Sequence, residues 1–301
     1  MMNYHEPVLL EESINGLNIN PDGVYLDLTF GGGGHSKIIL EHLKNGKLIA
    51  FDQDIDAEAN LINDKNFVFY KSNYRFFNNF LRFLKIEKVD GILADLGVSS
   101  HHFDTEERGF SFRFDSPLDM RMNNNQKLNA EVILNDYEEN RLRKIFFDYG
   151  ELRNSYQITK KILAYRKNKR IQKTEDLKKA IQDIIPKTKE NKFLAKIYQA
   201  IRIEVNDEIG ALKEMLEKTP EFMNDNARLV IISYHSLEDK PVKNFLKTGR
   251  FDGKIEKDIY GNYYRPFKPV YNKAIVPSEE ELKLNNRARS AKLRIAERIY
   301  E

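Results

Sequence analysis

A run of glycines is the pattern in this chain that most strongly indicates chemistry. Residues 31–34 are all glycine, an apolar run ending in Asp27 precedes them, and residues 37–43 follow with a helical pattern. That order predicts a strand, a tight turn and a helix N-terminus, the element that α/β folds use to bind nucleotide-like ligands. Glycine tolerates positive φ and lets a ligand approach the main chain. The loop is therefore a predicted ligand-binding site.

The residues around the glycines favour one class of ligand. A phosphate-binding loop ends in Gly-Lys-Ser or Gly-Lys-Thr, whereas residues 34–36 read Gly-His-Ser. A dinucleotide fingerprint, G-x-G-x-x-G, requires glycine where Ser36 stands. Asp27, just ahead of the loop, suits a positively charged ligand better than a pyrophosphate. S-adenosylmethionine carries a sulfonium and an ammonium but no phosphate, so these residues favour it.

Acidic and aromatic residues follow the next three strand-like runs. In open parallel sheets, ligands bind beyond the carboxyl ends of the strands. Asp52 lies about 20 residues past the loop, where an acid binds ribose hydroxyls; a helix cap is the alternative, which suits the neighbouring Asp54 well. Tyr74 is placed to lie against adenine, although a core aromatic fits the pattern nearly as well. Asp95 precedes a turn of small residues, 97–100, where the transferred group and its acceptor should meet.

The wider pattern predicts a parallel sheet that positions these residues. Strand-like runs alternate with helical segments, which implies parallel strands joined by right-handed crossovers. The strand-like runs are residues 24–28, 47–52, 66–70, 89–93 and 227–233. The helical segments are residues 35–43, 55–62, 74–84 and 239–247. We therefore predict an α/β fold.

A helical domain is expected to interrupt this sheet. From Thr105 the strands stop; Asn135 or Asp136 should cap a helix that ends at Tyr149. The predicted sheet domain comprises residues 1–104 and 211–301, and the inserted helical domain comprises residues 105–210. Further helices are expected at residues 154–167, 174–186 and 192–205.

The predicted insert is strongly basic. Between Arg141 and Arg202 the chain holds 18 Lys or Arg and 6 Asp or Glu, a net charge of +12 that leaves −9 for all other residues. Concentrated positive charge is typical of a site for a polyanion. The alternative interpretation is an ordinary solvated surface of helices.

The composition excludes several classes of protein. The 301 residues suffice for one large or two medium domains. No apolar run approaches the ~18 residues of a membrane span, and the N-terminus lacks the pattern of a signal peptide. The absence of cysteine excludes disulfides and thiolate metal sites and favours a cytoplasmic location. The histidines lack metal-ligand spacing, so we expect no catalytic metal.

Short segments along nearly the whole chain resemble one family. In order they read HEPVLL at 5–10, DLTFGGGGHS at 27–36, DLGVSS at 95–100, RGFSF at 108–112, PLDMRM at 117–122, QAIRI at 199–203, YHSLED at 234–239 and RSAKLR at 289–294. The ordered set resembles the bacterial S-adenosylmethionine-dependent ribosomal RNA methyltransferases called MraW or RsmH. The resemblance implies a class I methyltransferase, Rossmann-like fold and methyl transfer to N4 of a cytidine in the decoding region of small-subunit (16S) ribosomal RNA.

The resemblance also implies partners and site residues. The partner would be small-subunit ribosomal RNA, within an assembled or assembling subunit and away from any membrane, and a homodimer stays open. The basic insert and the tail would recognise the RNA, with Lys167, Lys169 and Arg170 of the insert and Arg289 of the tail near its phosphates. His102 stands where the family commonly has glutamine, and neutral histidine offers one donor and one acceptor. The residues implied to contact the methyl donor are Gly33, Gly34, His35, Asp52, Tyr74, Asp95 and His102.

The acceptor chemistry leaves the catalytic residue open. The lone pair of a cytosine amine is delocalised into the ring, so the enzyme must align the nitrogen with the sulfonium methyl and accept its protons; orientation alone supplies roughly 7–11 kcal/mol. Asp95, a main-chain carbonyl of residues 96–99 and His235 are the candidate acceptors. Methylation of a small molecule or a protein, and a non-catalytic RNA-binding factor that kept the fold, are the alternative functions. A serine hydrolase is disfavoured because no G-x-S-x-G turn is present.

Overall fold

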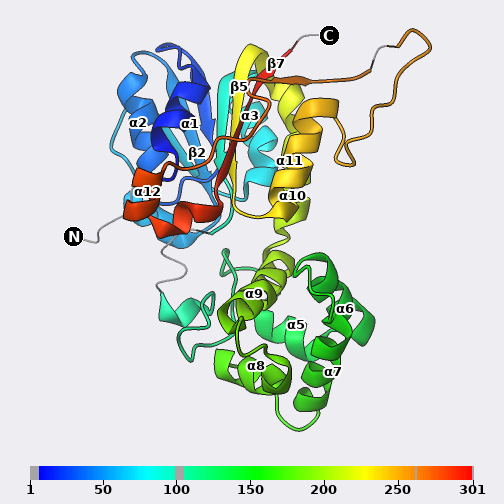
Figure 1. Cartoon of the computed structure of the whole chain (residues 1–301). Coiled ribbons are helices and arrows are strands. Elements are labelled where there is room, and N and C mark those ends of the chain that lie inside the picture. The colour runs from blue at the N-terminus through cyan, green and yellow to red at the C-terminus, as the bar shows by residue number, and fades with distance from the viewer. Residues whose placement is uncertain (1–6, 99–104, 262, 300–301) are drawn as a thin grey trace. The chain divides into compact units, whose positions relative to one another are not determined.

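The computed structural model describes residues 7–98, 105–261 and 263–299. The chain divides into two compact units, Met1–Gly97 with Ile209–Glu301 and Val98–Glu208. We call them the sheet unit and the helical unit (Figure 1). The sequence placed the insert at residues 105–210, whereas contacts divide the chain after Gly97 and Glu208.

The sheet unit is built on a seven-stranded sheet in the order β3-β2-β1-β4-β5-β7-β6. Strands β1 to β5 run parallel to one another, and β7 runs antiparallel to both β5 and β6. This mostly parallel sheet confirms the predicted Rossmann-like α/β fold. The strands are β1 Val24–Asp27, β2 Lys47–Asp52, β3 Phe67–Lys71, β4 Val89–Asp95, β5 Met223–Ser233, β6 Phe267–Pro269 and β7 Lys292–Arg298.

The order of the strands reverses between β1 and β4. The chain builds outward from β1 through β2 to β3, then returns to add β4 on the other side of β1. Such a switch point leaves a crevice at the carboxyl ends of the two strands, which is where open α/β sheets bind ligands. Asp27 ends β1 and Asp95 ends β4 at this crevice.

Helices cover both faces of the sheet (Figure 1). One hydrophobic cluster joins α1 and α2 to the sheet through residues such as Leu17 and Ile39. A second joins α3, α10 and α11 to it through residues such as Leu81 and Val242. The helices are α1 Leu10–Leu17, α2 Gly34–His42, α3 Phe77–Phe83, α10 Glu208–Lys218, α11 Ser236–Thr248 and α12 Glu279–Leu284, with short 3-10 turns η1 Ile55–Asn60, η2 Tyr74–Phe76, η5 Thr219–Phe222 and η6 Asn286–Ser290.

Two helical segments predicted in this unit are helical but not α-helical throughout. The segment 55–62 forms only the 3-10 turn η1, whose start is capped because the Asp54 side chain accepts a hydrogen bond from Asp56 N. The segment 74–84 begins as the turn η2 and becomes α-helical only at Phe77. The sequence analysis also missed α1, α10, α12, β6 and β7.

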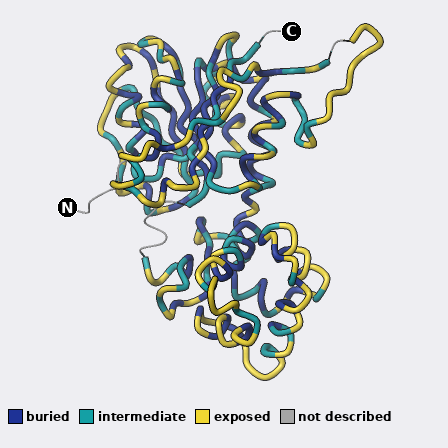
Figure 2. Tube along the Cα trace, viewed as in Figure 1, coloured by how far each residue is buried: buried dark blue, intermediate teal, exposed yellow. Residues whose placement is uncertain are grey.

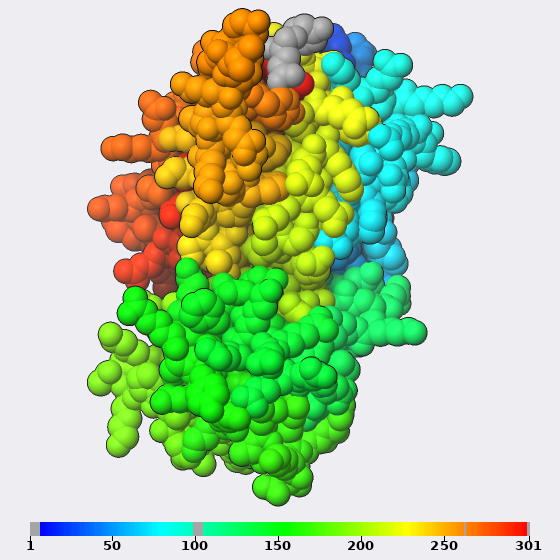
Figure 3. All heavy atoms as spheres, turned by 90° about the vertical axis from the view of Figure 1, so that its right-hand side faces the viewer, coloured from blue at the N-terminus to red at the C-terminus, as the bar shows by residue number. Residues whose placement is uncertain are grey.

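The helical unit has its own core (Figure 2), formed by buried residues such as Leu142, Ile162 and Ile201. Figure 3 shows α6 and α7, in green, at the surface of this unit. Among the described residues of the whole chain, no helix is long and apolar enough to cross a membrane. The helices are α5 Ala130–Asp136, α6 Glu139–Asp148, α7 Ser155–Arg166, α8 Thr174–Ile181 and α9 Glu190–Asn206, with turns η3 Glu106–Arg108 and η4 Gln182–Ile184.

The predicted cap at Asn135 or Asp136 was also wrong. Asp136 ends α5, and α6 begins three residues later. The Asn135 side chain does not cap a helix, because it accepts from Ile171 N and donates to Ile171 O and Glu131 O. It therefore fastens α5 to the chain that follows α7.

Candidate active site

The glycine-rich loop forms the predicted turn between β1 and α2. Gly31 and Gly33 have φ of 48° and 74°, in the left-handed region that favours glycine. Gly33 N donates to Phe30 O at 2.7 Å, and Lys37 N donates to Gly33 O at 2.9 Å. The strand, turn and helix N-terminus are thus confirmed.

The glycines are required for different reasons. A Cβ on Gly33 would lie 2.9 Å from the Phe30 ring, and one on Gly34 would overlap the Pro7 ring. A Cβ on Gly31 would meet nothing closer than the Thr29 carbonyl oxygen at 3.9 Å. Packing inside the protein therefore excludes side chains at Gly33 and Gly34, whereas Gly31 borders open space.

Asp27 fixes the two ends of the loop. Its side chain is 1% exposed, and it accepts hydrogen bonds from Ser36 Oγ at 2.7 Å and from Thr29 N at 3.1 Å. Burial raises the pKa of Asp27 to about 6, against the lowering effect of these hydrogen bonds. Its carboxylate is thus held mainly by the loop, and its charge acts on a ligand at a distance.

Asp52, at the end of β2, also contacts the loop. Its Oδ2 accepts from Gly31 N at 2.8 Å, and its Oδ1 accepts from Asp54 N at 2.9 Å. A carboxylate oxygen accepts up to two hydrogen bonds. These contacts therefore orient the carboxylate toward the loop without excluding ribose hydroxyls.

Tyr74 begins the turn η2 directly after β3. The preceding residues fasten this turn to the end of β2, because Ser72 N donates to Asp52 O at 2.8 Å and Asn73 Nδ2 donates to Gln53 Oε1 at 2.9 Å. The Tyr74 ring is partly buried against the sheet core. The structure thus brings Tyr74 to the same edge of the sheet as Asp52.

Asp95 is held from two sides at the end of β4. Its main-chain N–H donates to Thr29 Oγ1 at 2.6 Å, and Tyr234 Oη donates to its Oδ1 at 2.8 Å. Although the side chain keeps some exposure, desolvation by the surrounding protein raises the pKa of Asp95 to about 7. The Tyr234 hydrogen bond lowers the pKa, whereas the charges of Asp27 and Glu238 raise it. A carboxylate with this pKa is matched to proton transfer at neutral pH.

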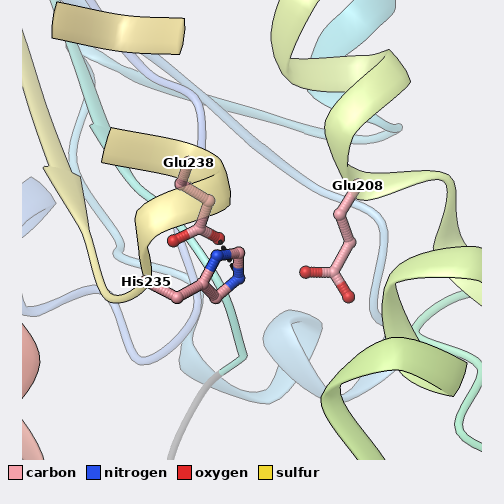
Figure 4. A group of neighbouring side chains, drawn as sticks. All are labelled: Glu208, His235 and Glu238. Atoms are coloured by element: carbon pink, nitrogen blue, oxygen red, sulfur yellow. Dashed lines mark ion pairs between the residues drawn. The ribbon is translucent and has the colours of Figure 1, made fainter. Parts of the chain in front are cut away.

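Glu238 positions the segment that follows β5 (Figure 4). It is 3% exposed in the first turn of α11, where the helix dipole favours a negative charge. Its Oε2 accepts from Tyr234 N at 2.8 Å, and its Oε1 lies 3.2 Å from His235 Nε2. Burial and the nearby Asp95 raise the pKa of Tyr234 well above its ordinary value, so Tyr234 stays a donor. Glu208, also drawn, accepts from Arg202 in the helical unit at 2.8 Å.

Sequence reasoning named His235 and missed Tyr234 and Glu238. All three lie in the segment 234–239 that supported the family resemblance, directly after a strand neighbouring β4. The sequence signal that could have identified Tyr234 is a hydroxyl directly after the end of β5. Because β4 and β5 are parallel neighbours, their last residues lie at the same edge of the sheet.

His35 is placed differently from the other predicted donor-binding residues. Its side chain is 7% exposed, and its Nε2 has no hydrogen-bond partner among the described residues. Burial lowers the pKa of His35 to about 4, against a hydrogen bond with the Val8 main chain. The imidazole is therefore neutral at pH 7 and packed inside the unit. His102 lies outside the described residues.

Two of the basic residues expected near phosphates form ion pairs with acids of the helical unit. Lys169 Nζ lies 2.6 Å from Asp176, and Arg170 lies 2.7 Å from Glu131 and 3.1 Å from Asp136. Lys167, at the end of α7, is exposed. Charge reversal at Lys169 or Arg170 would therefore break ion pairs of the helical unit itself.

Comparison with known proteins gives matches along the whole chain. The model of the MraW methylase family matches residues 2–299. A protein of Flavobacterium johnsoniae named ribosomal RNA small subunit methyltransferase H is 56% identical over 299 residues, which cover 99% of each chain. A protein of the same name from Bacteroides thetaiotaomicron is 55% identical over 298 residues, which cover 99% of this chain and 98% of that protein.

Proposed function

Because the chain belongs to the MraW methylase family, we propose that it transfers the methyl group of S-adenosylmethionine to N4 of a cytidine in the decoding region of small-subunit ribosomal RNA. The observation that carries this proposal is the set of acids at one edge of the sheet. Asp27, Asp52 and Asp95 end β1, β2 and β4 beside a glycine-rich turn at the switch point. A cationic methyl donor fits such a site.

We assign the donor contacts from this geometry. The Asp52 carboxylate accepts hydrogen bonds from the ribose hydroxyls, and the Tyr74 ring lies against adenine. The main chain at Gly33, Gly34 and His35 borders the donor, since the His35 ring is turned into the protein. Asp95 faces the methionyl and sulfonium end. His102, which lies outside the described residues, is assigned from the family resemblance alone.

Asp95 is the proposed proton acceptor. The amine nitrogen attacks the methyl carbon while the carbon–sulfur bond breaks, which leaves neutral S-adenosylhomocysteine and a methylated amine that must lose one proton. Asp95 has a pKa of about 7 and can take that proton at neutral pH. His235 is the alternative acceptor, and its Nε2 lies 3.2 Å from Glu238 Oε1.

The helical unit is the proposed RNA-recognition domain. It contains nearly all of the stretch 141–202, whose net charge is +12. Phosphate contacts by Lys and Arg supply much of the affinity of proteins for nucleic acids. An assembled or assembling small subunit is the proposed substrate, which places the reaction in the cytoplasm.

One experiment separates this function from its alternatives. Purified protein and labelled S-adenosylmethionine are incubated with small subunits, or with naked small-subunit RNA, from a strain that lacks the gene, and nucleosides are then identified by mass spectrometry. N4-methylcytidine at a single decoding-region site is the expected product, and subunits should be the better substrate. Donor binding by calorimetry without any RNA methylation would indicate another acceptor, and absence of donor binding would indicate a non-catalytic RNA-binding factor.

A further inference from the structure

Two exposed aromatic rings stand out on the helical unit. Phe147, in the last turn of α6, is 59% exposed, and Tyr156, in the first turn of α7, is 50% exposed. Among the described residues of this unit, they are the two large apolar side chains with such exposure. The adjacent Phe146 and Ile158 are fully buried. The core is therefore complete without the two exposed rings.

The two rings belong to one face, because α6 and α7 pack side by side and run antiparallel. Glu139, at the start of α6, pairs with Lys160 on α7 at 2.9 Å. One turn further along α6, the Arg143 guanidinium lies 5.7 Å from the centroid of the Tyr156 ring. Phe147 is one more turn along α6, on the same side of the helix as Arg143. We call the exposed surface around Arg143, Phe147 and Tyr156 the α6–α7 face. Figure 3 shows the two helices, in green, on the side of the unit that faces the viewer.

Cations lie beside the Tyr156 ring and elsewhere on the surface of α6, α7 and the loop between them. Lys160 Nζ lies 5.4 Å from the Tyr156 centroid, and Arg153 is exposed in the short loop, residues 149–154, that joins the two helices. Lys144 is exposed on α6. Within the described part of the chain, no acidic side chain pairs with Arg143, Lys144 or Arg153. From residue 143 to residue 160 the sequence has four Lys or Arg against two acidic residues.

We propose that the α6–α7 face binds an unpaired segment of ribosomal RNA, with bases stacked on Phe147 and Tyr156 and phosphates contacted by Arg143, Lys144 and Arg153. This inference rests on the proposed function and names the part of the helical unit that holds the RNA. Exposed rings beside cations are the combination that binds single-stranded nucleic acid, because every base has a face that stacks and every nucleotide carries a charge. A protein partner would also use aromatic and arginine side chains; the excess of cations over acids between residues 143 and 160 is what favours RNA.

Ring removal tests the stacking. Binding of a fluorescent, unstructured RNA of about 12 nucleotides is measured for Phe147→Ala and Tyr156→Ala, and each should weaken affinity by about fivefold to a hundredfold. Phe147→Tyr and Tyr156→Phe keep the rings and should bind within about twofold of wild type. Phe83→Ala is the matched control, since Phe83 is 78% exposed on α3 of the sheet unit. Thermal unfolding confirms that each variant is folded.

Charge removal tests the phosphate contacts. Arg143→Gln and Arg153→Gln should each reduce the slope of log affinity against log salt by about 0.7, the value for one contact to a single strand. An RNA duplex of the same length should compete poorly with the single strand, because its bases are already stacked. Equal competition by the duplex would overturn the stacking part of the proposal.

The outcomes separate this inference from the proposed function. If wild-type protein methylates small subunits while the alanine variants bind the single strand as wild type does, the α6–α7 face is not the RNA site and the function stands. If wild-type protein methylates nothing but ring removal abolishes RNA binding, the face is correct and the proposed reaction is wrong. Loss of affinity for a ribosomal protein, with RNA binding unchanged, would assign the face to a protein partner and refute the proposal.

Discussion

Replacing Tyr234 by phenylalanine should shift the pH range in which the protein is active. The Tyr234 hydroxyl donates a 2.8 Å hydrogen bond to Asp95 Oδ1. This bond lowers the pKa of a carboxyl group that desolvation has raised to about 7. Asp95 must be ionised to accept the proton of the amine. Without the hydroxyl its pKa rises further, so ionisation requires a higher pH.

The size of the shift follows from the hydrogen bond that is lost. A hydrogen bond to a charged group contributes roughly 1.5–3 kcal/mol, and one pKa unit corresponds to about 1.36 kcal/mol. The midpoint of the rise of kcat/KM with pH should therefore move upward by about one to two units. At neutral pH the Tyr234→Phe protein should keep about a fifth to a fiftieth of the wild-type kcat/KM, and about half of the activity or more should be recovered near pH 9.

The assay follows methyl transfer to unmodified small subunits, with kcat/KM measured from about pH 6 to about pH 9.5, because this parameter reports the pKa of groups in the free enzyme. Tyr260→Phe is the control, since Tyr260 is 83% exposed and its hydroxyl is not part of the site. That control should keep the wild-type profile. A Tyr234→Phe protein that loses activity equally at every pH would refute the reasoning, because Tyr234 would then act only on the structure.

Three further predictions concern the donor site and the glycine-rich loop beside it. Asp52→Ala should weaken S-adenosylmethionine binding by about ten- to a hundredfold, since a charged acceptor is lost. An unchanged donor affinity, measured by calorimetry, would show that the ribose is bound by other residues. Gly33→Val should lower the free energy of unfolding by at least about 1–3 kcal/mol, because φ is 74° and the new Cβ meets the Phe30 ring; a wild-type melting temperature would contradict this. Affinity for S-adenosylmethionine should rise as pH increases through about 7, the pKa of Asp95. Affinity for S-adenosylhomocysteine, which lacks the sulfonium charge, should rise less. Equal pH dependences for the two ligands would show that Asp95 does not lie beside the sulfonium.

The sequence analysis correctly predicted the elements that depend on residues close together in the chain. The strand, turn and helix around residues 31–34 follow from local glycine and apolar patterning, and the structure contains them with the expected order. Strand β7 was missed because it carries four charged side chains in its seven residues and is only partly buried. It is stabilised by antiparallel pairing with β5, about sixty residues earlier in the chain, which no local pattern reveals.

The same limit applies to the site. Asp52 and Asp95 were found because an acid at a strand end needs only the position of the strand to be recognised. The partner of Asp95 is Tyr234, which is 139 residues further along the chain. Likewise, the ion pair between Arg170 and Glu131 spans 39 residues. Sequence alone therefore could not distinguish an arginine that pairs with an acid of its own unit from one that is available to contact RNA.

The electrostatics of the sheet edge explain why the site suits a cation. Asp27, Asp95 and Glu238 are held close enough for Asp27 and Glu238 both to raise the pKa of Asp95. Assembling like charges in a desolvated place costs free energy that hydrogen bonds from Ser36 and Tyr234 only partly offset. In the proposed reaction, a bound sulfonium would offset the remainder and favour ionised Asp95, the form that accepts a proton. After transfer the sulfur would be neutral and Asp95 would carry the proton, so the site would attract the product less than it attracts the donor.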